Sequence, residues 1–151
     1  MAPALFDRVG RDVELTYEGE DLKKAMALLG KMDTTKALAD VEAAIVYVGK
    51  RTGKRVGVIG YCYGGLLAWL GATRLRPAAA VGYYAGQIGS FAAETPKAPV
   101  QLHFGQLDTH IPAEQVEAVH AAPGDMRSSY NPQAAALARG RALDFLKEHL
   151  L

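Results

Sequence analysis

Apolar residues recur along the chain at two alternating spacings, which predict helices and strands in turn. Steps of three and four residues are typical of amphipathic helices, and short β-branched or continuous apolar runs are typical of buried strands. The expected helices cover residues 20–31, 35–50, 63–73 and 113–122, with a last one after a cap at Ser129 or Asn131. The expected strands cover residues 2–6, 55–60, 78–84 and 99–104. Pro3 confines the first of these to a sheet edge or a strand's tail.

Strands that alternate with helices indicate an α/β fold, in which a mostly parallel sheet is covered on both faces. The helix at 63–73 is apolar nearly all round, so we expect it to be deeply buried. The last helix has an expected apolar face of Leu137, Ala138, Leu143, Phe145 and Leu146. Repeats and linkers are not visible, and we expect one domain over residues 1–151.

A glycine-rich turn that holds the cysteine joins the strand at 55–60 to its helix. Residues 55–65 read RVGVIGYCYGG, so glycines bracket Cys62 as G-x-C-x-G-G. A nucleophile at a tight strand-to-helix turn has a strained backbone, and its neighbours two before and two after must be small. The thiol would then sit at the amino end of the following helix, where unpaired backbone N–H groups and the helix dipole favour a thiolate and a nearby oxyanion. This pattern predicts a nucleophile, although it is also compatible with a small cysteine buried in the core.

Three polar residues follow expected strands and should therefore share one rim of the sheet. Ligands of parallel sheets bind beyond the carboxyl ends of the strands, where Cys62, Tyr84 and Asp108 fall. Asp108 fits either a carboxylate that orients a catalytic histidine or a turn residue. His103 lies inside a strand pattern and is expected in the core. His120 is the weak candidate for a base, since its helix pattern favours a solvent-facing position.

Composition narrows the class of partner. Half of the residues are hydrophobic, 22% are charged and the net charge is +1, which favours a small-molecule partner and argues against nucleic acid. A single cysteine permits no intrachain disulfide, and no metal-ligand spacing is visible, so we expect neither metal nor cofactor. We expect a reduced cytoplasmic compartment and no membrane association, because no leader or 18-residue apolar run is seen.

Four segments occur in an order that resembles a known family. GYCYGG after VGVI, AVGYYAG, LHFGQLDTHIP and SYNPQAAALARGRALDFL are similar to the dienelactone hydrolases, the carboxymethylenebutenolidase-like enzymes. APALFDR and DVEAAIVY extend the resemblance over essentially the whole chain. The family opens lactone rings on an α/β-hydrolase fold, a three-layer sandwich around a mostly parallel sheet. The resemblance therefore implies this fold and a carboxylic ester or lactone as substrate.

The resemblance also implies a role for individual residues. Cys62 would be the nucleophile that attacks the carbonyl and forms an acyl-enzyme, with Asp108 as the acid of the catalytic triad. The backbone N–H of Tyr63 would donate to the oxyanion. Tyr84 would line the pocket, and Arg127 would meet a substrate carboxylate.

Two family segments have no counterpart in the sequence. One resembles G-x-G-H-G-F and carries the triad histidine, and the other is an amino-terminal Q-E-I-F-G-like motif. We therefore expect a shortened member with an incomplete sheet. It is either a gene fragment or a protein that repairs the sheet, by an inward shift of residues 2–6 or by pairing with another chain in a homo-oligomer. Two alternatives to a cysteine-dependent hydrolase stay open: a catalytically impaired or inactive remnant that acts in binding or assembly, and a redox-responsive thiol.

Overall fold

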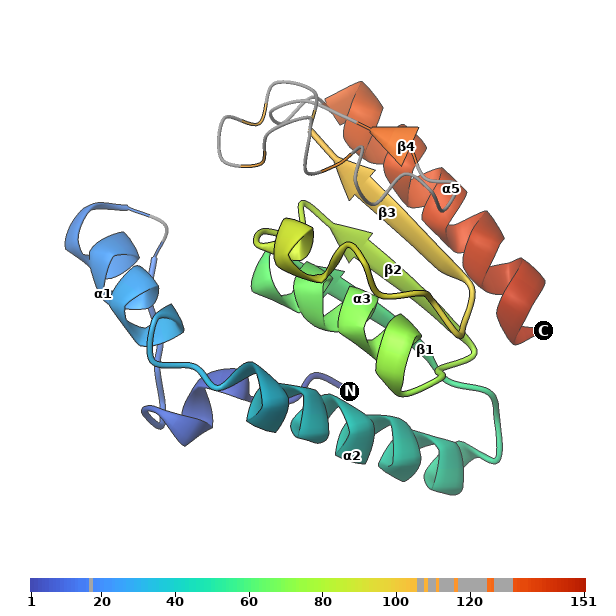
Figure 1. The fold of residues 1–151 in the computed structure, drawn as a ribbon, viewed down its shortest axis with the longest axis horizontal. Coiled ribbons are helices and arrows are strands. Elements are labelled where there is room, and N and C mark those ends of the chain that lie inside the picture. The colour runs from blue at the N-terminus through green and yellow to red at the C-terminus, as the bar shows by residue number, and fades with distance from the viewer. Residues whose placement is uncertain (17, 106–107, 109–110, 112–115, 117–124, 127–131) are drawn as a thin grey trace.

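The computed structural model describes residues 1–16, 18–105, 108, 111, 116, 125–126 and 132–151 (Figure 1). Four parallel strands of this part of the chain form one sheet in the order β1-β2-β3-β4. The strands are β1 (Gly57–Tyr61), β2 (Ala79–Tyr83), β3 (Val100–Phe104) and β4 (Asp125–Met126). The expected parallel sheet is confirmed, and all carboxyl ends of its strands lie at one edge.

Helices cover both faces of the sheet. The helices are α1 (Gly19–Leu29), α2 (Thr34–Thr52), α3 (Tyr63–Arg74) and α5 (Pro132–Leu150), with short 3-10 helices η1 (Leu5–Arg8) and η2 (Ile88–Phe91). Ala68 and Ala72 of α3 pack with Ala80 on one face. On the other face, Ala142 and Leu146 of α5 pack with Val81. The result is a three-layer arrangement with α3 and α5 on opposite sides (Figure 1).

Helix α3 is the centre of the hydrophobic core, as its apolar sequence predicts. Residues 65–73 are all buried, and Leu66, Leu67, Trp69 and Leu70 are among the largest fully buried side chains. Ala37, Leu38 and Val41 of α2 join the same cluster. Large-to-small changes in such a helix cost about 2–5 kcal/mol, so the fold depends on this element more than on any surface helix.

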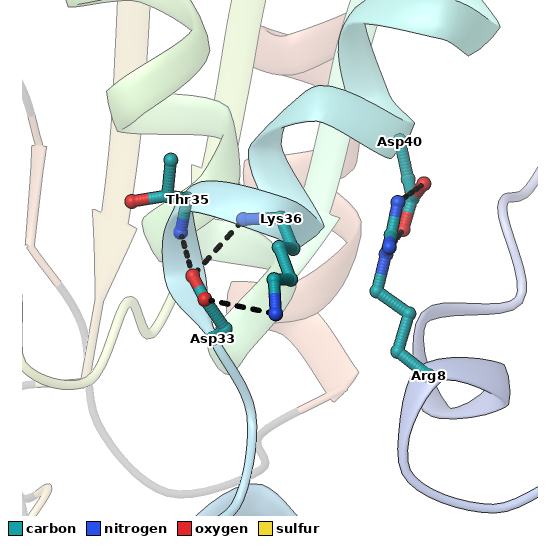
Figure 2. Close-up of polar contacts among 5 residues, drawn as sticks. All are labelled: Arg8, Asp33, Thr35, Lys36 and Asp40. Carbon is teal, nitrogen blue, oxygen red and sulfur yellow. Dashed lines mark hydrogen bonds and ion pairs between the residues drawn. The ribbon is translucent and has the colours of Figure 1, made fainter.

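The amino-terminal expectation of a strand at 2–6 is wrong. The backbone N–H groups of Asp7 and Val9 donate to Ala4 and Phe6, which closes helical turns instead of a strand ladder. Arg8 then holds η1 against α2 through two hydrogen bonds of 2.6 Å to the Asp40 carboxylate (Figure 2). Within the described residues β1 has no strand on its other side, so the sheet is incomplete at that edge.

Helix α2 begins one residue before and ends two residues after the predicted range 35–50. The Asp33 carboxylate accepts hydrogen bonds from the backbone N–H of Thr35 at 2.9 Å and of Lys36 at 3.1 Å (Figure 2). These bonds hold the pKa of Asp33 below its usual value, and the bond from Lys36 contributes most. The helix ends at Gly53, whose φ of 65° suits glycine.

The apolar face that the sequence predicts for the last helix requires correction. Leu137 and Leu143 are 48% and 45% exposed, because the buried stripe of α5 runs through Ala138, Ala142 and Leu146 at four-residue steps. Helix α1 buries no residue and lies apart from the sheet (Figure 1). Strand β4 lies in a part of the sequence where no strand was predicted, because at two residues it is too short for a periodic signal. The helix expected at 113–122 and the caps Ser129 and Asn131 lie outside the described residues.

A polar clamp fixes the connection between β2 and β3 to the carboxyl end of α3. Glu94 accepts hydrogen bonds from Thr73 Oγ1 at 2.7 Å and from Arg74 Nε at 3.0 Å. The indole Nε1 of Trp69 donates to the Phe91 carbonyl at 3.2 Å. The bond from Arg74 is the main reason why the pKa of Glu94 lies below its usual value.

We predict that Glu94→Gln lowers the free energy of unfolding at neutral pH by about 1 kcal/mol, because it removes the charge that Arg74 and Thr73 bind. A lowered folded-state pKa gives stability that is present above the unfolded pKa and lost as pH falls through the folded pKa. The difference from wild type should therefore be largest at neutral pH and should shrink progressively as pH falls through the folded-state pKa of Glu94. Urea unfolding over a series of pH values measures it.

Glu42→Gln is the matched control, since Glu42 is an exposed glutamate on α2. Equal effects of the two substitutions at neutral pH would contradict the clamp.

Candidate active site

Cys62 occupies the sharp turn between β1 and α3 that the sequence predicts. It is the residue that caps α3, with φ of 54° and ψ of −118°, a conformation that costs a residue other than glycine strain energy. Its backbone N–H donates to the Tyr83 carbonyl at 3.0 Å, and its carbonyl accepts from the Gly65 N–H at 2.9 Å. The residue is exposed, so the reading as a buried core cysteine is wrong.

The glycines around Cys62 permit backbone segments to touch. A Cβ on Gly60 would lie 1.8 Å from the Gly64 carbonyl oxygen, and one on Gly65 would lie 2.7 Å from the Tyr83 carbonyl oxygen. A Cβ on Gly64 would meet nothing within 4 Å. The expectation of a small residue two positions before Cys62 is confirmed, whereas on the other side the constraint falls three positions after it, on Gly65.

Tyr63 begins α3 directly after Cys62. The first N–H groups of a helix have no intrahelical acceptor, so the Tyr63 N–H belongs to a set suited to an anion beside the thiol. The phenol of Tyr63 donates to Thr34 Oγ1 at 3.3 Å and ties this turn to the start of α2. The oxyanion role of this N–H remains a prediction.

Tyr84 follows β2 on the same edge of the sheet. Its φ is 38°, its N–H donates to the His103 carbonyl at 2.7 Å, and its side chain is 45% exposed. Because the neighbouring Tyr83 carbonyl accepts the Cys62 N–H, the backbones of Tyr84 and Cys62 lie next to each other. Its role in lining a pocket remains a prediction.

Asp108 lies four residues beyond the end of β3, on the edge that also holds Cys62 and Tyr84. Its N–H donates to the Gly105 carbonyl at 3.1 Å, and its side chain is half-buried. This placement agrees with a shared rim, and its role as an acid remains a prediction. Arg127 and His120 lie outside the described residues.

The sequence reading missed an aromatic stack beneath this rim. The rings of Tyr61 and Tyr83 are stacked with centroids 4.9 Å apart, and those of Tyr83 and His103 with centroids 4.7 Å apart. Burial, and then proximity to Tyr61, raises the pKa of Tyr83. His103 is buried, with Nε2 at 3.2 Å from Gln101 Oε1, which confirms the expected core position. The stack could have been predicted from the strand register, which pairs Tyr61 with Tyr83 and Tyr83 with His103.

In the part of the chain that the structure describes, no three histidine, cysteine, aspartate or glutamate side chains come together in a way that could hold a metal ion. Among the same residues, no helix combines the length and apolar character needed to cross a membrane.

We predict that Gly60→Ala lowers the free energy of unfolding by more than about 2 kcal/mol, because the new Cβ meets backbone that cannot rotate away. Gly64→Ala is the control: the site has open space and lies inside α3, so its effect should stay within about 1 kcal/mol. Urea unfolding compares the two proteins. Similar losses of stability would contradict the close approach of the two backbones at Gly60.

Known proteins resemble this chain over most of its length. A model of the dienelactone hydrolase family matches residues 1–123. Carboxymethylenebutenolidases from Pseudomonas putida and Pseudomonas knackmussii are each 32% identical over 170 residues, covering 97% of this chain and 72% of theirs. A crystal structure from Klebsiella pneumoniae, titled as a dienelactone hydrolase, is similar to this chain with a TM-score of 0.69 and 22% sequence identity. The match covers 95% of this chain and 72% of the Klebsiella chain and shows the α/β-hydrolase fold. The chain therefore belongs to the dienelactone hydrolase family.

Proposed function

We propose that this protein hydrolyses a carboxylic ester or lactone through an acyl-enzyme on Cys62. The observation that carries the proposal is the exposed thiol at the amino end of α3, on a residue with φ of 54°. Membership of the dienelactone hydrolase family supports a hydrolase function. The name of the relatives, carboxymethylenebutenolidase, supports a lactone as one class of substrate.

The reaction has two halves. In the first, the deprotonated sulfur of Cys62 forms a C–S bond to the carbonyl carbon while the π electrons move to the oxygen. The tetrahedral intermediate then collapses, the C–O bond breaks, and the alkoxide leaves with the proton that a general base took from the thiol; His120, the weak candidate, is the histidine that the sequence offers for this base. In the second half, water adds to the thioester, the C–S bond breaks, and a carboxylic acid and the free thiol are released.

The helix end supports the charged steps. The oxyanion of both intermediates would lie beside the first N–H groups of α3, with Tyr63 as one donor; loss of a donor of this kind costs about 3 kcal/mol in other enzymes. In this scheme Asp108 orients the base, and Tyr84 borders the pocket. Arg127 supplies a cation for a substrate carboxylate. In a lactone the alkoxide stays attached to the acyl group, so the product is a single hydroxy acid.

We predict that Cys62→Ala abolishes ester hydrolysis, with a fall in kcat/KM of about a thousandfold or more, because loss of a nucleophile removes the acyl-enzyme route. Asp108→Asn should lower kcat while Cys62 still reacts with iodoacetamide. Hydrolysis of a lactone and an open-chain ester by purified protein measures the effect.

The same assay separates the alternatives. Turnover that survives Cys62→Ala would contradict the proposal. Rapid alkylation of Cys62 without any turnover would instead favour a non-catalytic member or a redox-responsive thiol, and the pH dependence of alkylation records how readily the thiolate forms.

A further inference from the structure

Three stacked rings cross the sheet on the side covered by α5, and the last of them belongs to the residue before the candidate nucleophile. His103 of β3, Tyr83 of β2 and Tyr61 of β1 are register partners, and their rings are nearly parallel, with interplanar angles of 16° and 15°. The phenol of Tyr83 donates to the Ala138 carbonyl of α5 at 3.4 Å. The middle ring is therefore covered on both faces and anchored at its tip.

The stack ends at Tyr61 with an accessible ring. Tyr61 is 57% exposed, and β1 has no strand beyond it within the described residues. Tyr84 stands near its side, with ring centroids 6.3 Å apart and planes tilted by 47°. The rings of Tyr61 and Tyr84 thus form one exposed aromatic surface, which we call the Tyr61 shelf.

The Tyr61 shelf includes the chain neighbour of the proposed nucleophile, since Tyr61 ends β1 and immediately precedes Cys62. The acyl group remains bonded to the Cys62 sulfur through the proposed reaction, whereas the alcohol leaves. A group on this shelf is therefore more readily part of the acyl half of the substrate.

We propose that Tyr61 is a specificity-determining residue that binds a planar aromatic ring on the acyl group of the ester. The proposal rests on the proposed function of Cys62. The ligand ring adds a fourth member to the stack, in the offset or tilted geometry that aromatic pairs prefer. Since Tyr83 already holds the Tyr61 ring, little side-chain freedom is lost on binding.

Two acyl groups of similar volume test the preference. The substrates are trifluoroethyl esters of 3-phenylpropanoic and 3-cyclohexylpropanoic acid, whose leaving group has no ring. We expect kcat/KM to favour the phenyl ester by about two- to twelvefold, the range that aromatic pairs contribute beyond area burial. Tyr61→Phe should keep this preference and Tyr61→Leu should lose it. Tyr47→Leu, at a 49% exposed tyrosine on α2, should keep it.

A binding measurement keeps the inference separate from the reaction. In Cys62→Ala protein, the ring protons of 3-phenylpropanoate should shift upfield in NMR, and this shift should disappear when Tyr61→Leu is added. Absence of turnover together with this shift overturns the proposed function and leaves the Tyr61 shelf supported. A phenyl preference or an upfield shift that survives Tyr61→Leu, or the absence of any shift, would overturn the shelf.

Discussion

The structure depends on the close approach of the first turn of α3 to the ends of β1 and β2. Backbone lies against backbone here, since a Cβ on Gly60 would meet the Gly64 carbonyl and one on Gly65 the Tyr83 carbonyl. A Cβ on Gly82 would lie 2.8 Å from Leu102 Cδ2 and 3.0 Å from the Gly65 carbonyl. Glycine at these positions lets the chain turn from strand to helix within one residue. That residue is Cys62.

Strain at Cys62 persists because both sides of the turn are fixed. Its N–H and carbonyl are bonded to Tyr83 and Gly65, and the helix that follows is buried over nine consecutive residues. Glu94 and Trp69 hold the far end of α3 through side-chain hydrogen bonds. A strained, exposed residue on a rigid support is typical of functional sites, where geometry must not relax when a substrate arrives.

Sequence patterns predicted those parts of the molecule that depend on neighbouring residues. The strands at 55–60, 78–84 and 99–104, the buried helix and the turn at Cys62 follow from local periodicity and glycine spacing. Residues 2–6 form no strand, because local turns and the Arg8–Asp40 ion pair determine their conformation. The aromatic stack depends on strand register, which a single strand's sequence does not specify.

In the candidate site, too, some features follow from the local sequence and others depend on contacts between residues far apart in the chain. The position of Cys62 follows from its own segment, and its shared rim with Tyr84 and Asp108 follows from the parallel strands. The backbone contact between Cys62 and the end of β2 requires the strand order, and the exposed ring of Tyr61 requires the sheet edge. Side chains that meet across strands come from contacts between residues far apart in sequence. Such contacts cannot be obtained from spacing alone.

The central claim, that Cys62 is a covalent nucleophile, is tested most directly by trapping the acyl-enzyme. Wild-type protein is mixed with an ester, quenched in acid within the first turnover, digested and analysed by mass spectrometry. The account predicts an added acyl mass on the peptide that contains Cys62. An unmodified Cys62 during measurable turnover, or an acyl group on another residue, would contradict it.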